Sequence, residues 1–352
     1  MKPLKTYACY LKNEEIRMNS SSGAVFSALA FYVFENQGIV YGVAMSEDCY
    51  SAEFISVTDE AGLKRLRGSK YLQAKMGDTY KKVKADIIAG RMVLFSGTGC
   101  QINGLKNYLN VGNVDIGKLI CVDVICHGVP SPRLWGKYAQ YHEKKNGGKL
   151  KMIHFRCKDG GWMKFGIRVS VVNAYGNEVK KRYISKDKDS YMQMFLRDYC
   201  LRPSCYECAA KDIKMSDITI ADFWGIDDIV PKVNDNKGIS LVLIRTEKGQ
   251  LIFDEVSREM WIQDVSYEDG IKNNPAEYRS AERPVQRDVF FEDMQSMSFE
   301  KLEKKYIVLP INKKVRRKLK NILMSILRIC RGGKICNSEY GLLFVIKNSK
   351  FL

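Results

Sequence analysis

The stretch RMVLFSGTGCQINGLKNYL, residues 91–109, decides the fold. It begins with a short apolar run that is typical of a buried strand and ends with the apolar spacing of a helix over 101–109. Between them stand Gly97, Thr98 and Gly99, followed by Cys100. Open α/β sheets bind ligands where a strand runs through such a turn into a helix. The stretch therefore predicts an α/β fold with Cys100 at a ligand site.

The same plan recurs at the next strand. Residues 119–125 form another apolar run, which leads into Cys126, His127 and Gly128, and a helix is expected over 132–143. Two cysteines that follow two strands of one sheet can converge in space although they are far apart in sequence. We expect Cys100 and Cys126 to meet at one edge of the sheet.

The flanking sequence extends this fold in both directions. Before residue 91, a helix after the NSSSG turn (residues 19–23) is followed by strands and short helices in βα alternation. From residue 151 the strands become longer and alternate as an antiparallel meander, before the helix expected over 190–199 and a strand over 217–221. The prediction is a mixed α/β fold: a central, partly parallel sheet with flanking helices, an antiparallel strand region and a basic C-terminal helix.

Composition restricts the class of protein. The chain has 352 residues, 45% apolar and 28% charged, which is ordinary for a globular protein with two modest domains. It has neither an N-terminal apolar segment nor an apolar run long enough to span a bilayer, so we predict a cytoplasmic protein. Its eleven cysteines would then be reduced and serve as ligands, reactive groups or small core residues.

The net charge of +17 is unevenly distributed. Residues 304–352 contain thirteen Lys and Arg and one acid, Glu339, so residues 1–303 carry only +5. This weakens a nucleic-acid function for the whole protein. Within the tail, apolar and basic residues recur at helical spacing, which predicts an amphipathic helix. One interpretation is peripheral contact with the inner face of the membrane; the other is a helix that docks on the body of the protein.

Four cysteines have glycine or proline nearby, which is typical of a metal-cluster site: Cys100, Cys126, Cys205 and Cys208. Thiolates bind soft metals, and unhindered backbone amides can hydrogen-bond cluster sulfides. A C-x2-C pair alone is equally a zinc half-site. Cys200 is a possible substitute ligand, Cys157 follows a strand and can line the site, and Cys121 is interpreted as core.

Several polar residues have both a functional and a structural interpretation. The serines at 20–22 suit a pyrophosphate or simply cap a helix. Lys70 suits a phosphate, or is a solvated surface residue. His127 is interpreted as a supporting or structural residue, not as an activator of Cys126. Asp222 and Trp224 follow a strand, so they either approach a cofactor or fill the core.

With these motifs identified, the chain resembles the beta-subunit family of coenzyme F-420 hydrogenases and dehydrogenases. The resemblance runs from about residue 19 to about residue 255 and rests on these motifs, in order: SSSGAVFSALA, GSKYLQA, VLFSGTGCQINGLKNYL, ICHGVPSP, FRCKDGGW, RPSCYECA and SDITIADFWGI. It implies an iron–sulfur flavoprotein that holds FAD and a [4Fe–4S] cluster. Many bacterial relatives of this kind are encoded among polysaccharide-synthesis genes.

The resemblance also implies the site residues. Its cysteine motifs correspond to four cluster ligands: Cys100, Cys126, Cys205 and Cys208. The motifs that would flank the flavin contain Ser22, Gly23, Ser69, Lys70, Tyr71, Thr98 and Gln101. Two positions depart from the family pattern, because Gly99 replaces a usual proline and Ala24 replaces a usual glycine. No catalytic residue is implied.

The resemblance divides the chain into four predicted regions. The first is an N-terminal conserved region on the flavin side (1–110), and the second is a C-terminal conserved region with the cluster ligands and antiparallel strands (111–270). A helical connector (271–310) and a basic amphipathic tail (311–352) follow. Relatives often carry an N-terminal ferredoxin domain with C-x2-C-x2-C-x3-C-P runs, which this chain lacks. Either a separate ferredoxin-like protein serves as electron donor or acceptor, or the chain has lost this electron input and does something else.

The predicted function is an oxidoreductase that passes electrons between the cluster and FAD. Hydride exchange would involve an unknown organic substrate, small or sugar-linked, or a deazaflavin or nicotinamide carrier, with polysaccharide biosynthesis as one setting. The alternative is a zinc-bearing, non-catalytic scaffold or binding protein of a glycan-assembly complex, in which the same thiolates hold one zinc. Nucleic acid is not an expected partner, because the tail lacks interleaved aromatic residues.

Overall fold

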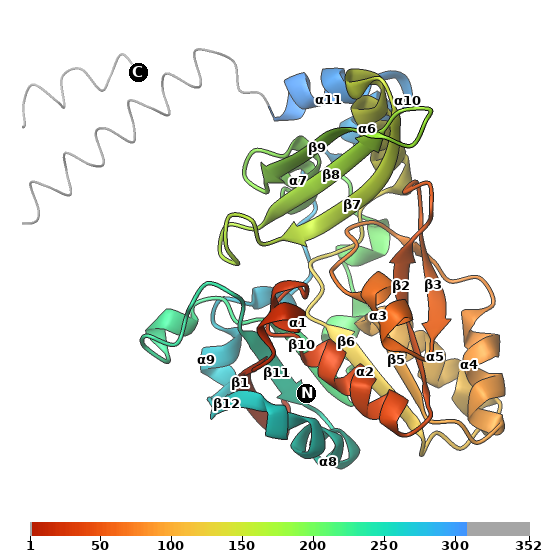
Figure 1. Cartoon of the computed structure of the whole chain (residues 1–352), viewed down its shortest axis with the longest axis vertical. Coiled ribbons are helices and arrows are strands. Elements are labelled where there is room, and N and C mark those ends of the chain that lie inside the picture. The colour runs from red at the N-terminus through yellow and green to blue at the C-terminus, as the bar shows by residue number, and fades with distance from the viewer. Residues whose placement is uncertain (1, 308–352) are drawn as a thin grey trace, which may run out of the picture. The chain divides into compact units, whose positions relative to one another are not determined.

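A computed structural model describes residues 2–307 of the chain (Figure 1). The chain divides into two compact units, residues 1–299 and residues 300–352. The helix predicted within 311–352, and with it the proposed membrane or docking role of the tail, lies outside the described residues. The four predicted region boundaries stay predictions. Among the described residues, no helix is both long and apolar enough to cross a bilayer.

A nine-stranded mixed sheet forms the centre of the first unit, in the order β12-β1-β11-β10-β6-β5-β2-β3-β4. The four neighbours β10, β6, β5 and β2 are parallel, whereas β11, β1 and β12 continue the sheet in antiparallel fashion. This confirms the predicted mixed α/β class. The strands are β1 (Lys5–Leu11), β2 (Ile39–Met45), β3 (Ala52–Val57), β4 (Ala74–Lys75), β5 (Val93–Thr98), β6 (Leu119–Val124), β10 (Ile218–Asp222), β11 (Ser240–Ile244) and β12 (Met260–Asp264).

Helices cover both faces of this sheet (Figure 1). Successive strand residues point to opposite faces, so Leu94 packs with α2 and α8, whereas Val93 and Phe95 pack with α4 and α5. Cys121 lies in the second of these cores, as predicted. The helices are α1 (Glu14–Met18), α2 (Val25–Glu35), α3 (Glu60–Leu66), α4 (Thr79–Ile88), α5 (Gly99–Val111), α6 (Pro132–Asn146), α7 (Ser190–Leu196), α8 (Glu247–Val256), α9 (Tyr267–Ile271), α10 (Arg287–Ser296) and α11 (Phe299–Tyr306).

A second sheet has three antiparallel strands: β7 (Lys149–Cys157), β8 (Gly166–Val172) and β9 (Glu178–Ser185). It confirms the predicted meander. The sheet lies above the nine-stranded sheet in Figure 1, together with α6 and α7. Its β7 strand ends at Cys157, and β8 begins on the same side at Gly166, so the loop between them faces the larger sheet.

Two features of the N-terminal region were not predicted correctly. The strand β1 was missed, because its pairing with β11 and β12 joins residues more than 230 positions apart. The serine turn does not cap α2 with a hydroxyl: the N-cap is Ala24, which has a left-handed backbone with φ 72°. The positive φ at Ala24 explains why glycine suits this position.

The burial of His142 predicts that the stability of the folded state depends on pH. It is buried on α6 between Tyr138 and Tyr141, and its Nε2 atom has no hydrogen-bond partner among residues 2–307. Burial, with smaller contributions from the charges of Lys145 and Arg182, lowers its pKa to about 4. The unfolded chain protonates near pH 6.5, so the folded state becomes less stable as the pH falls from about 6.5 towards 4.

A His142→Leu variant should therefore lose part of the acid sensitivity. In the wild type, His142 lowers the free energy of unfolding by about 3 kcal/mol once the pH is below 4, compared with neutral pH. Urea unfolding of both proteins at pH 7 and pH 4.5 measures it. An equal loss of unfolding free energy in both proteins would contradict this role of His142.

Candidate functional site

The four predicted ligand cysteines line one small pocket of about 40 Å³. Cys100 is the second residue of α5, directly after β5, and Cys126 follows β6. Cys205 ends the 3-10 turn Pro203–Cys205, and Cys208 follows three residues later. The structure therefore brings together thiols from three separate segments, at the carboxyl ends of two neighbouring parallel strands.

Two kinds of metal centre accept four thiols as ligands, and they differ in how far apart they hold the sulfur atoms. In the described residues 2–307, no three His, Cys, Asp or Glu side chains are grouped closely enough to hold one metal ion. A tetrahedral zinc would hold its sulfur atoms about 3.8 Å apart, given Zn–S bonds of about 2.3 Å. A four-iron cube needs a wider arrangement, because each thiolate binds a different iron. Four thiols are a donor set that either a four-iron cube or a single tetrahedral zinc ion accepts.

Burial affects the protonation of these thiols. It raises the pKa of Cys126 to about 12, and the neighbouring Cys205 and Cys100 act in the same direction, while the ammonium of Lys211 opposes them. Burial also raises the pKa of Cys205. A bound metal must therefore displace protons from these thiols. Lys211 donates hydrogen bonds to the carbonyls of Cys126 (2.7 Å) and Ala276 (2.5 Å), which holds the two walls of the pocket together.

The other candidate cysteines lie elsewhere. Cys200 is fully buried and lines neither this pocket nor the larger cavity beside it. Cys157 lines neither of them, and its thiol donates to a carboxylate oxygen of Asp159 at 2.9 Å.

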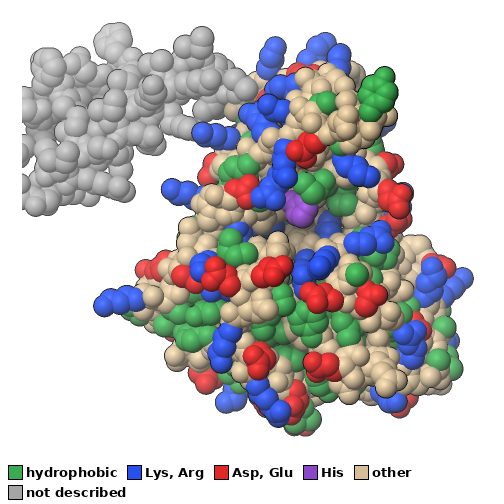
Figure 2. Space-filling model, viewed as in Figure 1, with side chains coloured by type: hydrophobic (Ala, Val, Ile, Leu, Met, Phe, Trp, Pro, Cys, Tyr) green, Lys and Arg blue, Asp and Glu red, His purple; other side chains and the backbone are tan. Residues whose placement is uncertain are grey.

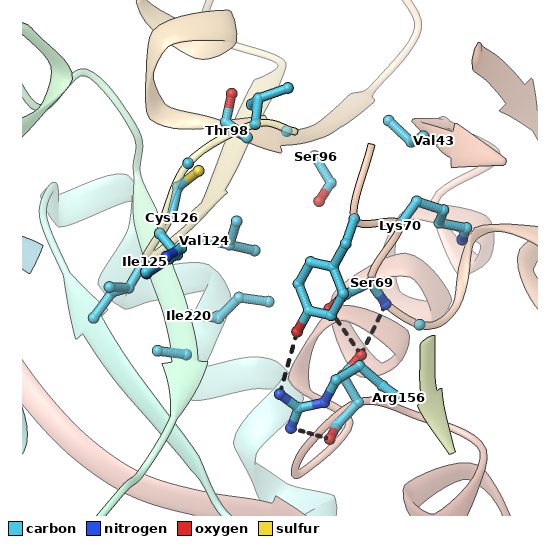
Figure 3. Close-up of a pocket in the computed structure, with 18 of the residues that line it drawn as sticks. Val43, Ser69, Lys70, Ser96, Thr98, Val124, Ile125, Cys126, Arg156 and Ile220 are labelled. Atoms are coloured by element: carbon cyan, nitrogen blue, oxygen red, sulfur yellow. Dashed lines mark hydrogen bonds between the residues drawn. The ribbon is translucent and has the colours of Figure 1, made fainter. Parts of the chain in front are cut away.

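A much larger cavity, about 1020 Å³, adjoins the cysteine pocket. Cys100, Cys126 and Thr98 line both, so the two share a wall. Figure 3 shows Thr98 and Cys126 across the cavity from Ser69 and Arg156. Six of the seven residues predicted to flank the flavin line the cavity: Ser22, Ser69, Lys70, Tyr71, Thr98 and Gln101.

Gly23 is the seventh and lines neither space. A Cβ atom there would lie 2.4 Å from the carbonyl oxygen of Cys9 and 2.9 Å from the amide nitrogen of Ser240. Gly23 therefore allows the serine turn to pack closely against β1 and β11. This contact positions its neighbours Ser21 and Ser22 at the cavity.

The serine turn is joined to the GSKY segment by hydrogen bonds that the sequence did not reveal. The Ser21 hydroxyl accepts from the Ser69 amide (3.0 Å) and lies 3.2 Å from the Ser69 hydroxyl. The Ser22 hydroxyl instead donates to the carbonyl of Ile239 at 2.8 Å. Ser21 and Ser69 therefore form one polar rim of the cavity, whereas Ser22 anchors the turn.

Lys70 has a structural partner within the chain. Its ammonium donates to the last carbonyls of α3, those of Arg65, Leu66 and Arg67, at 2.8 to 3.0 Å. Burial lowers its pKa to about 7, while these three carbonyls favour the charged form. The predicted contact of Lys70 with a flavin stays a prediction.

Thr98 and Gln101 begin α5 as a capping box. The Gln101 side-chain oxygen accepts from the Thr98 amide (2.9 Å) and hydroxyl (3.1 Å), and the hydroxyl lies 3.2 Å from the Cys100 sulfur. This arrangement orients the first turn of α5 where it faces both the cavity and the cysteine pocket. A Cβ at Gly99, the next residue, would approach Asp123 and Ala210 at 3.0 and 3.3 Å.

Arg156 is the cavity residue that the sequence analysis missed. Arg156, labelled in Figure 3, lies at the end of β7 and is 8% exposed. Its guanidinium donates to Asp222 (2.6 Å) and to the Ser21 carbonyl (3.2 Å). It also stacks on Phe165, with 3.8 Å from its central carbon to the ring centroid. Trp162 donates to the same Asp222 oxygen at 2.5 Å. The FRCKDGGW motif and Asp222 had been noted, but their pairing depends on the tertiary fold.

The imidazole of His127 contacts Asp198 and Phe195. Its Nε2 atom lies 2.8 Å from a carboxylate oxygen of Asp198, and its ring packs edge-on against Phe195. This geometry agrees with the supporting role expected from the sequence.

The cavity lining is strongly basic. Within the described part of the chain, Asp222 is the only carboxylate in the lining, and it is paired with Arg156. Six basic side chains of the same part line the cavity: Arg67, Lys70, Lys75, Arg156, Lys186 and Arg202. A space of this size and charge suits an elongated, anionic ligand with apolar parts.

Comparisons with known proteins agree with this architecture. The profiles of coenzyme F420 hydrogenase/dehydrogenase beta subunit, N-term and C terminus, match residues 6–80 and 90–269. A chain in a structure of the F420-reducing [NiFe] hydrogenase complex from Methanosarcina barkeri, 17% identical, has the same fold with a TM-score of 0.51, over 88% of this chain and 94% of that one. No curated protein matches the sequence. Since the two profiles together cover most of the protein, the chain belongs to the coenzyme F420 hydrogenase/dehydrogenase beta-subunit family.

Proposed function

We propose that this protein is an iron–sulfur flavoprotein that passes electrons between a [4Fe–4S] cluster and FAD. The family supports an oxidoreductase electron-transfer subunit in general terms. One observation carries the finer proposal: four thiols line a pocket that shares a wall with a large basic cavity. When bound, the flavin supplies hydride exchange with an organic substrate and the cluster supplies one-electron transfer.

The residues of the chain would then divide the work as follows. Cys100, Cys126, Cys205 and Cys208 hold the cluster, and the Lys211 ammonium beside them offsets part of its negative charge. The basic lining of the cavity neutralises the flavin pyrophosphate, and the rim of Ser21 and Ser69 offers hydroxyls and amides to it.

The proposal includes partners and substrate. The proposed partner is a separate ferredoxin-like protein, which would exchange electrons at the cysteine pocket. The Methanosarcina barkeri neighbour is part of a hydrogenase complex, which supports protein partners in general. The organic substrate would be a small or sugar-linked molecule, and polysaccharide biosynthesis is the proposed setting.

Metal and flavin analysis after anaerobic purification tests the proposal directly. We expect about four iron and four labile sulfide per chain, as a four-iron cluster requires, together with one FAD. One zinc per chain and no flavin would contradict it and favour the scaffold alternative.

A variant that fills the cavity tests the flavin site and the cluster site independently. Ser96 lies within β5 and lines the large cavity but not the cysteine pocket. A Ser96→Phe variant should lose most of its flavin, because the ring occupies the ligand's space, and should keep its iron. Flavin release after denaturation and iron content measure the two effects. Ser56→Phe, at a strand position outside the cavity lining, is the control; flavin retained in Ser96→Phe would place the ligand elsewhere.

A further inference from the structure

The basic charge of the described body is concentrated in one segment. Residues 144–188 contain thirteen Lys and Arg and three acids, a net charge of +10. Residues 1–303 together carry +5, so those outside this segment, 1–143 and 189–303, carry a net charge of −5. This segment comprises the end of α6, the three-stranded sheet and the residues just after it. The body is therefore electrically polarised, with its positive pole on the small sheet.

The strand β9 carries the centre of this charge. It pairs with β8, and among the described residues no other strand pairs with it, so it is an edge strand. Its residues 178–182 are all exposed, and three of them are basic: Lys180, Lys181 and Arg182. Lys and Arg side chains gather over the small sheet in Figure 2.

Exposed apolar side chains accompany these charges. The loop that joins β8 to β9 presents Tyr175, which is 89% exposed, and Val179 at the start of β9 is 44% exposed. Lys149 pairs with Val172 at the same end of the sheet, beside Lys144 and Lys145 at the end of α6. The hairpin end of the sheet therefore combines an exposed aromatic tip with surrounding basic residues.

Protection of a sheet edge explains only part of this surface. Lysines on an edge strand prevent unwanted strand pairing, but that purpose is not served by exposing Tyr175 and Val179. Docking of a redox partner explains it poorly as well. The nine residues of β7 separate the Lys149 end from the cavity end by about 27 Å, so a partner at the hairpin would be far from the cysteine pocket.

We propose that the β8–β9 hairpin is a docking element for an anionic lipid surface. Tyrosine is suited to the headgroup region of a bilayer, where its ring is buried and its hydroxyl remains hydrated. Lysines and arginines beside it are attracted to anionic lipids, at about a fivefold gain in affinity for each residue near the surface. The inference is independent of the proposed redox function, because none of the hairpin residues lines the cavity or the cysteine pocket.

Vesicle sedimentation of the full chain tests this. The probe is vesicles of phosphatidylcholine with phosphatidylglycerol, compared with phosphatidylcholine alone. The wild type should bind the anionic vesicles, and binding should weaken as salt is added. A K180Q/K181Q/R182Q variant should bind at least tenfold more weakly, and Tyr175→Ser should weaken the binding that remains at high salt.

A matched control removes three exposed charges elsewhere, at Lys81, Lys82 and Lys118, and should retain wild-type binding. The tail is present in every variant, so differences among them report on the hairpin. Equal binding by the hairpin and control variants would overturn the proposal, as would absence of wild-type binding to anionic vesicles. Iron and flavin contents should be the same in all variants, so a failure of the redox proposal would leave this result unaffected.

Discussion

A Cys126→Ser variant purified without oxygen is expected to lose nearly all of its iron and labile sulfide. Burial raises the pKa of the Cys126 thiol to about 12, and the backbone carbonyl of Cys126 accepts a hydrogen bond from Lys211. Serine has almost the same volume, so the pocket keeps its shape while one soft thiolate ligand is lost. Iron and sulfide assays, with the visible absorption spectrum, measure the result.

Cys200→Ser is the matched control for this experiment. Cys200 is also a buried cysteine, five positions before Cys205, and it does not line the pocket. It should keep wild-type iron and sulfide. If Cys200→Ser lost the cluster and Cys126→Ser kept it, the assignment of ligands would be wrong.

An Arg156→Met variant is expected to have a free energy of unfolding about 3–5 kcal/mol lower than that of the wild type, because it leaves the largely buried carboxylate of Asp222 without its cation. The same change removes the link between β7 and the serine turn, since Arg156 also donates to the Ser21 carbonyl. Flavin affinity should therefore fall as well. Urea unfolding and a flavin titration measure the two effects.

Arg168→Met is the control on the neighbouring strand β8. Its partner Asp159 and its own side chain are both substantially exposed, so the expected loss is about 0–1 kcal/mol. Similar losses in the two variants would show that Arg156 does not brace the cavity. An unfolding change in Arg156→Met without any change in flavin affinity would separate its structural role from its role in the site.

The spacing of apolar residues predicted those strands and helices that are specified by residues close together in the sequence. The strands at β5 and β6 and the helices after them were predicted because apolar runs end at glycine-containing turns. The short helices expected before residue 91 include α3, which is capped locally by Asp59, whose side chain accepts from the Gly62 amide. Pairings between distant segments, such as β1 with β11, leave no local pattern and were not predicted.

The candidate site likewise has features that the sequence predicted and features that only the tertiary structure shows. Cys100 and Cys126 were expected to converge, because two strand ends of one parallel sheet define a common edge. The role of Arg156 was not expected, since its partners Asp222 and Ser21 lie 66 and 135 positions away. Lys70 was singled out by its motif, but only the fold shows that its ammonium binds the carbonyl end of α3.

The amino-acid sequence by itself determined the α/β class, the strand-turn-helix units and the four cysteines that follow their turns, because these depend on residues close together along the chain. Only the tertiary structure decided that all four thiols line one pocket, that this pocket shares a wall with a basic cavity, and that Arg156 joins the two sheets around it. The physical reason is that long-range packing and buried charge pairs bring together side chains whose separation in sequence carries no local signal.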